Sequence, residues 1–163
     1  LGIDMFDFVF PTRTARFGTA FTKFGNLTLK HASCATDLAP IEPGCPCEVC
    51  APPPPETRKH YSRALLHAMF KDPARSSLAG SLVSLHNVTY MLRLSARMRD
   101  AVWHGDYASF CREFFRDMFR DPAAAGGGAG GGAGAAAAKD EAAWRRRVPS
   151  WVVDALGAVG ISL

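Results

Sequence analysis

The sequence predicts an α/β fold in which strands come first, a metal-binding segment follows, and helices complete the chain. An apolar run at residues 1–10 has the composition of a buried strand. From Lys59 onward, apolar residues recur at intervals of three and four, as on one face of a helix. Between these regions three cysteines fall within six residues. With 163 residues, 48% of them hydrophobic, the chain is large enough to form a hydrophobic core.

The first strand is predicted at Leu1–Phe10. This run is apolar except for two carboxylates, and Pro11 ends it. Because Asp4 and Asp7 are an odd number of residues apart, a regular strand would place them on opposite faces. Spacing alone favours two aspartates that cap a turn at the end of the strand.

A loop and a hairpin are predicted next. Residues 12–16 contain two arginines and no apolar pattern, which is typical of a solvated surface loop. Residues 17–30 alternate between apolar and polar about Gly25-Asn26. This alternation predicts two short strands joined in a hairpin.

The cysteine cluster predicts a metal site. Cys45, Cys47 and Cys50 lie too close in sequence for easy disulfide pairing, because ring closure in Cys-x-Cys is strained. Zinc accepts three thiolates and one imidazole in a closed tetrahedral site, so we expect Zn²⁺ in a structural role. Spacing leaves three histidines open as the fourth ligand: His60, His67 and His86.

Helices are predicted over most of the remaining chain. After a polyproline spacer at residues 52–55, the first helix spans about 59–72 and the second about 74–103, with Gly80 as a candidate break. A third helix is expected to begin after Asp106 and to end at residues 121–122. The predicted inward-facing residues are Tyr61, Ala64, Leu65, Ala68 and Met69 on the first, Leu78, Leu82, Leu85, Thr89 and Leu92 on the second, and Tyr107, Phe110, Phe114, Met118 and, to a lesser extent, Phe115 and Phe119 on the third.

Two segments close the chain. Residues 123–138 contain only alanine and glycine, so they have no side chain that could bury a large apolar area, and we expect a disordered insertion. The run from Trp151 to Ile161 is apolar enough to need a docking surface. Arg145, Arg146 and Arg147 are expected to be solvated.

Composition restricts the classes of protein. A formal charge of +4 and a pI near 9.0 permit a nucleic-acid partner without indicating one. Five cysteines, an odd number, argue against a secreted disulfide scaffold. The sequence has no apolar stretch of membrane-spanning length, and its first residues include two aspartates where a signal peptide would be uniformly apolar. We therefore expect a reducing, intracellular compartment.

Several motifs in order resemble the C-terminal part of the tRNA-guanine transglycosylase family. These motifs are Gly2-Ile3-Asp4-Met5-Phe6-Asp7, Pro11-Thr12-Arg13 with Arg16, Cys45-x-Cys47-x-x-Cys50 and His86-Asn87. The resemblance covers about residues 1–119, and the closing residues 151–163 are similar to the tail of the family's eukaryotic catalytic subunits. It implies the last strands of a TIM (β/α)₈ barrel, an inserted zinc-binding subdomain and terminal helices.

The resemblance also implies an activity and roles for residues. Enzymes of this family exchange guanine at the anticodon wobble position of tRNA for queuine or a precursor, through a covalent aspartyl-ribosyl intermediate. Asp7 would be the nucleophile, and Asp4 would support the strand end. Contacts to tRNA would come from Thr12, Arg13, Thr14, Ala15 and Arg16, and the zinc ligands would be Cys45, Cys47, Cys50 and His86.

Further expectations concern organisation and partners. The implied regions are barrel strands at 1–33, the zinc subdomain and helices at 34–122, the insertion at 123–143 and the tail at 144–163. A homologous non-catalytic subunit would complete a heterodimer. The enzyme would be cytoplasmic, and the resemblance also allows an association with mitochondria. The family's second catalytic aspartate and its base pocket lie on earlier strands, so this chain is not expected to be active alone.

Departures from the family pattern and two alternatives remain. Phe8 stands where bacterial members commonly have cysteine, and the interval from Cys50 to His86 is longer than usual by about the proline insert. One alternative is the non-catalytic partner subunit, against which Asp7 with Arg13 and Arg16 argues. The other is a zinc-stabilised module that binds RNA or protein.

Overall fold

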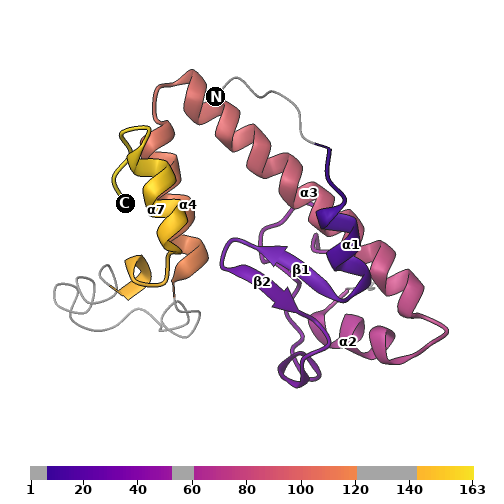
Figure 1. Cartoon of the computed structure of the whole chain (residues 1–163). Helices are drawn as coiled ribbons and strands as arrows, with labels where there is room; N and C mark the ends of the chain where they lie inside the picture. The colour runs from indigo at the N-terminus through magenta and orange to yellow at the C-terminus, as the bar shows by residue number, and fades with distance from the viewer. Residues whose placement is uncertain (1–6, 53–60, 121–142) are drawn as a thin grey trace, which may run out of the picture. The chain divides into compact units, whose positions relative to one another are not determined.

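Two compact units make up the chain. The structure, a computed structural model, describes residues 7–52, 61–120 and 143–163. One unit comprises Leu1–Thr22 with Asn26–Ser95, and the other comprises Lys23–Gly25 with Ala96–Leu163. The predicted polyproline spacer from Pro53 on, His60 and the alanine-glycine segment lie outside the described residues. Figure 1 shows the order of the helices and strands.

Helix α1 (Phe10–Arg16) replaces a predicted strand end and loop. Residues 1–6 of the predicted strand lie outside the described part of the chain, residues 7–9 are not in a strand, and Phe10 begins the helix. The strand prediction is therefore wrong at residues 7–10, and the loop prediction for residues 12–16 is wrong. Pro11 lies in the first turn of the helix, where its fixed φ is already helical and its missing N–H is not needed.

The predicted hairpin is confirmed, with its turn displaced. Strands β1 (Thr19–Thr22) and β2 (Gly25–Thr28) pair in a two-stranded sheet, and α1 packs against β1. The turn lies at residues 23–24 rather than at Gly25-Asn26. Gly25 ends the hairpin turn with φ +96°, a backbone conformation that residues with a Cβ rarely adopt.

The cysteine segment and helix α2 (Arg63–Lys71) build the core of the first unit. The segment follows a 3₁₀ turn, η1 (Ala32–Cys34), which contacts α2. The hydroxyl of Ser62 accepts a hydrogen bond from Leu65 N at 3.1 Å and caps α2, and the helix ends before Pro73 as predicted. Its buried face contains Leu66, Met69 and Phe70, whereas Leu65 and Ala68, which were predicted to face inward, are exposed.

Helix α3 (Ser76–Trp103) is continuous through Gly80, so the predicted break is absent. Its buried residues are Ala79, Gly80, Val83, His86 and Asn87. The predicted apolar stripe is mostly exposed: Leu78, Leu85 and Leu92 are 55%, 41% and 66% exposed. Of its leucines only Leu82, which is partly buried, packs against the core. The inward face is made of small and polar residues because α1 approaches closely; a Cβ on Gly80 would lie 3.5 Å from Arg16 Cα.

The second unit is built around aromatic side chains. Helix α4 (Tyr107–Phe119) begins after Asp106 as predicted, although the Asp106 side chain forms no capping hydrogen bond. Its fully buried residue is Cys111, and the predicted aromatic residues are only half-buried. Helix α7 (Ser150–Gly157) brings Val152 onto Trp144, Val148, Phe115 and Phe119. The closing segment thus docks through Val152, while Trp151 remains exposed.

The only sheet in the described residues is this hairpin, so the predicted barrel strands are not confirmed. No helix among the described residues combines the length and the hydrophobicity needed to cross a bilayer.

Candidate metal centre and the adjoining helix

Four side chains of the first unit converge on one point in its core. The Sγ atoms of Cys45, Cys47 and Cys50 lie 3.8, 3.5 and 3.3 Å from Nδ1 of His86. All four candidate ligand atoms are within 4.8 Å of one another, and all four residues are buried. The group could therefore hold a metal ion.

The backbone of β1 sets the orientation of the His86 ring. Nε2 lies 2.8 Å from the carbonyl oxygen of Phe21, which can only accept, so Nε2 carries the proton and donates. Nδ1, which faces the three sulfur atoms, is then free of a proton in the neutral ring. Burial lowers the pKa of His86 and favours this neutral form. A histidine that binds a metal through one ring nitrogen usually donates the N–H of the other to a group such as a backbone carbonyl.

The thiols are buried together without a disulfide. All five cysteines of the chain are free. Burial raises the pKa of Cys45, and it raises the pKa of Cys50 to about 12. Without a cation the thiols of Cys45 and Cys50 would keep their protons at neutral pH, so a divalent ion that binds here would have to displace these protons. The site fits a tetrahedral ion that prefers soft ligands, because three sulfur atoms and one nitrogen atom supply all four ligands and no water is needed as a further ligand.

Of the three candidate histidines, the structure places His86 beside the cysteines. His67 is held elsewhere, because its Nδ1 lies 2.9 Å from the carbonyl oxygen of Leu29. His60 lies outside the described residues.

Asn87 connects the metal centre to α1. Its Nδ2 donates to the carbonyl oxygens of Pro11 and Thr19, both at 3.0 Å, and its Oδ1 accepts from Phe21 N at 2.9 Å. Its side chain is fully buried, so these three bonds are shielded from water. Residues 86 and 87 therefore fix the cysteine cluster, the hairpin and the start of α1 to one turn of α3. The sequence pattern gave Asn87 no role of its own, since an asparagine within a helix is usually solvated.

The remaining predicted site residues lie on α1 or just before it. Asp7 is exposed and lies three residues before Phe10, where α1 begins. Thr12, Arg13 and Arg16 are exposed on the helix, and the described carboxylates form no ion pair with either arginine. Ala15 is fully buried in the core. Thr14 is half-buried, and its hydroxyl donates to the carbonyl oxygen of Phe10 one turn earlier on the same helix.

Comparisons with known proteins match this region. The protein family described as queuine tRNA-ribosyltransferase matches residues 1–120. The queuine tRNA-ribosyltransferase of Thermus thermophilus is 41% identical over 119 residues, which cover 73% of this chain and 28% of that protein. The queuine tRNA-ribosyltransferase catalytic subunit of Schizosaccharomyces pombe is 31% identical over 164 residues, which cover 100% of this chain and 34% of that protein. The chain thus spans about a third of the length of these relatives.

Proposed function

Because this chain belongs to the queuine tRNA-ribosyltransferase family, we propose that it forms part of an enzyme that exchanges guanine at the wobble position of tRNA for queuine. The observation that carries this proposal is the family match over residues 1–120. It is supported by the exposed carboxylate of Asp7, three residues before a helix that carries two exposed arginines. The match of the whole chain to a catalytic subunit favours the catalytic role over that of a non-catalytic partner.

Asp7 is the proposed nucleophile. Its carboxylate oxygen attacks C1′ of the wobble nucleotide and forms a covalent ester with the ribose, while the bond from C1′ to the base breaks. Guanine leaves with the electron pair of that bond and takes up a proton. In the second step queuine, losing a proton, forms its bond to C1′ and displaces Asp7. Two inversions at C1′ leave the configuration unchanged.

Helix α1 is the proposed reader of the tRNA beside the wobble position. Arg13 and Arg16 are three residues apart, so they lie on the same side of the helix. Neither is neutralised by a described carboxylate, and a guanidinium can donate two parallel hydrogen bonds to a base edge or a phosphate. Thr12 adds an exposed hydroxyl on the same helix.

The cysteine-histidine group is proposed to hold zinc through Cys45, Cys47, Cys50 and His86. The ion would supply a structural crosslink between the cysteine segment and α3. It would also act on α1 indirectly, because Asn87 follows His86 and bonds to the carbonyl oxygen of Pro11. The metal centre would thereby set the position of Arg13 and Arg16 without contacting the tRNA.

We further propose that the enzyme acts in the cytoplasm as a heterodimer with a homologous non-catalytic subunit. The free, metal-competent cysteines agree with a reducing compartment. If the chain were only a zinc-stabilised RNA-binding module, it would bind tRNA without ever becoming covalently attached to it.

The proposal is tested by looking for the covalent intermediate in a full-length enzyme of this family that contains this chain as its C-terminal part. Asp7→Asn should abolish the tRNA adduct that survives denaturing electrophoresis and should lower base exchange by orders of magnitude, because an amide is a poor nucleophile. Its affinity for tRNA should remain, since α1 is unchanged. Asp4→Asn serves as the control, and an Asp7→Asn enzyme that still forms the adduct would exclude Asp7 as the nucleophile.

A further inference from the structure

An ion pair joins the cysteine segment to α3 beside the metal group. Nη1 of Arg93 lies 3.4 Å from Oε2 of Glu42, although the two residues are 51 positions apart in the sequence. Glu42 comes shortly before the three cysteines, and Arg93 follows His86 on α3 by two helical turns. Residues separated by two turns lie on the same side of a helix. The ion pair therefore lies on the side of α3 that carries the histidine of the metal group.

Glu42 is tied to two of the cysteines through its backbone. Its carbonyl oxygen accepts from the Cys45 N–H at 3.1 Å. Burial raises the pKa of Cys50, and the Glu42 N–H, which donates to the sulfur of Cys50, lowers it. The Glu42 side chain is only 10% exposed, so its carboxylate needs a partner that replaces the lost water. Arg93 supplies a positive charge at this point.

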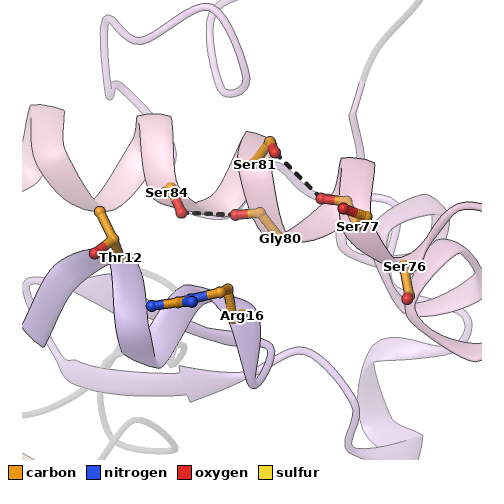
Figure 2. A pocket seen from close by; sticks show the side chains of 7 residues that line it. All are labelled: Thr12, Arg16, Ser76, Ser77, Gly80, Ser81 and Ser84. Atoms are coloured by element: carbon orange, nitrogen blue, oxygen red, sulfur yellow. Dashed lines mark hydrogen bonds between the residues drawn. The ribbon is translucent and has the colours of Figure 1, made fainter. Parts of the chain in front are cut away.

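Arg93 is presented from a helix that is itself fixed. Figure 2 shows the crossing of α3 with α1, where Gly80 lies close to Arg16. Further along, Asn87 bonds to β1 and to the start of α1. The helix continues without a break from these contacts to Arg93. The Arg93 side chain remains 45% exposed, so the place of its charge depends on the contact with Glu42.

A positive charge beside the metal group would favour the forms of the ligands that bind a metal. Three thiolates outweigh the charge of one divalent ion, so the occupied site would be a buried anion. Burial raises the pKa of Cys45, and the charge of Arg93 acts against this effect. Burial lowers the pKa of His86, and the charge of Arg93 acts in the same direction. Arg93 thus favours both the thiolate and the neutral imidazole.

We propose that Arg93, held by Glu42, is a positioning residue of the metal centre whose permanent positive charge stabilises the metal-bound cysteines. The proposal rests on the zinc site proposed above. The alternative is an ion pair that only crosslinks the cysteine segment to α3. The two roles can be separated, because removing either partner breaks the crosslink, whereas only the removal of Arg93 takes away the positive charge.

The test is the zinc affinity of the chain, measured by competition with a chromophoric chelator. We expect Arg93→Gln to lower this affinity by about tenfold or more, as the loss of an outer contact of a metal site typically does. Glu42→Gln breaks the same ion pair but keeps Arg93 and the backbone bonds of residue 42. It should therefore lower the affinity by about threefold or less, in the range of a part-exposed ion pair. Arg93→Lys, which keeps the charge, should stay close to the unchanged chain.

Arg99→Gln is the matched control for the change in net charge. Arg99 is an exposed residue of the same helix, and the described residues leave it without an ion pair. Its substitution should leave the zinc affinity unchanged. Equal losses of affinity in Arg93→Gln and Glu42→Gln would overturn the role of the charge and leave only the crosslink. A loss in Arg93→Lys as large as in Arg93→Gln would overturn it as well.

Cobalt(II) in place of zinc shows whether the four ligands still assemble. At saturating cobalt, Arg93→Gln should keep the absorption bands of a tetrahedral cobalt ion bound by thiolates, because no ligand has changed. Loss of these bands would mean that the ion pair builds the ligand geometry, and would overturn the role of the charge. A chain that binds zinc equally well with and without Arg93 would reject this inference and keep the zinc site. An unchanged chain that binds neither metal would reject both.

Discussion

His86 links the cysteine segment to the hairpin of the first unit, because its two ring nitrogens have different partners. Nδ1 faces three sulfur atoms, and Nε2 donates to the carbonyl oxygen of Phe21. Few other side chains offer both a metal ligand and a backbone donor from the same rigid ring. A substitution at this position would therefore remove a ligand and leave a buried carbonyl without its donor.

We predict that His86→Ala loses bound zinc and that His67→Ala retains it. The first variant lacks a ligand, so its zinc affinity should fall by at least about 100-fold and its free energy of unfolding by several kcal/mol, since metal-binding energy is folding energy. His67 contacts the Leu29 carbonyl and not the cysteines, which makes it the matched control. Zinc content after gel filtration, measured by atomic emission, is the readout. Full zinc occupancy in His86→Ala would show that another residue completes the site.

At the scale of single elements, an ion pair fixes the start of α2. Asp37 accepts hydrogen bonds from Ala39 N at 2.9 Å and from Arg63 Nη1 at 2.8 Å. Arg63 also donates to the carbonyl oxygen of Ile41 at 2.9 Å. The Ala39 N–H and then Arg63 lower the pKa of Asp37 below its usual value, against the effect of burial. Both side chains are part-buried, so the pair is more than a solvated surface contact.

We predict that Asp37→Asn lowers the free energy of unfolding by about 1 kcal/mol at pH 7. Because the pKa of Asp37 is lower in the folded chain than in the unfolded chain, its carboxylate stabilises the fold above the unfolded value and loses this effect as the pH falls through the folded value. The difference between the two proteins should therefore shrink below about pH 4. Urea unfolding at pH 7 and pH 3 measures it. Asp100→Asn, an exposed change without a described ion pair, is the control. If the difference in the free energy of unfolding did not change with pH, the charge of the Asp37 carboxylate would not contribute to stability.

At the scale of the whole molecule, only one of the two units contains the metal group. Cys45, Cys47, Cys50 and His86 belong to the first unit, whereas the second is held by the cluster of Trp144, Val148 and Val152. All three tryptophans of the chain belong to the second unit, and Trp144 is 3% exposed. The two units should therefore respond differently to metal removal.

We predict that a chelator unfolds the first unit at a temperature at which the second remains folded. Cys34, Cys45, Cys47 and Cys50 should become reactive to a thiol reagent, while Cys111 of the second unit stays protected and the emission of Trp144 stays blue-shifted. Mass spectrometry of the labelled peptides and fluorescence give both readouts. Val152→Ala should have the opposite effect, releasing Trp144 while the cysteines stay protected. Simultaneous loss of both signals on chelation would show that the units fold as one.

The sequence by itself determined the features that depend on local patterns. Three cysteines within six residues are a metal-ligand pattern whatever the fold around them, and their convergence with a histidine was predictable. The apolar periodicity of α2, α3 and α4 predicted that helices exist there, and the positions of Ser62 and Pro73 agree with where α2 begins and ends. The family motifs in order were likewise readable without coordinates.

Only the tertiary structure decided which side of each element faces inward. The leucine stripe of α3 is the more apolar side, but α1 and β1 lie against the other side, because Gly80 permits the close crossing and Asn87 bonds to both. Residues 12–16 form a helix whose first turn contains Pro11, and that same asparagine donates to the Pro11 carbonyl oxygen. His86 rather than His67 faces the cysteines since the Phe21 carbonyl orients one ring and the Leu29 carbonyl the other. Each of these outcomes depends on a partner distant in sequence, which local spacing cannot specify.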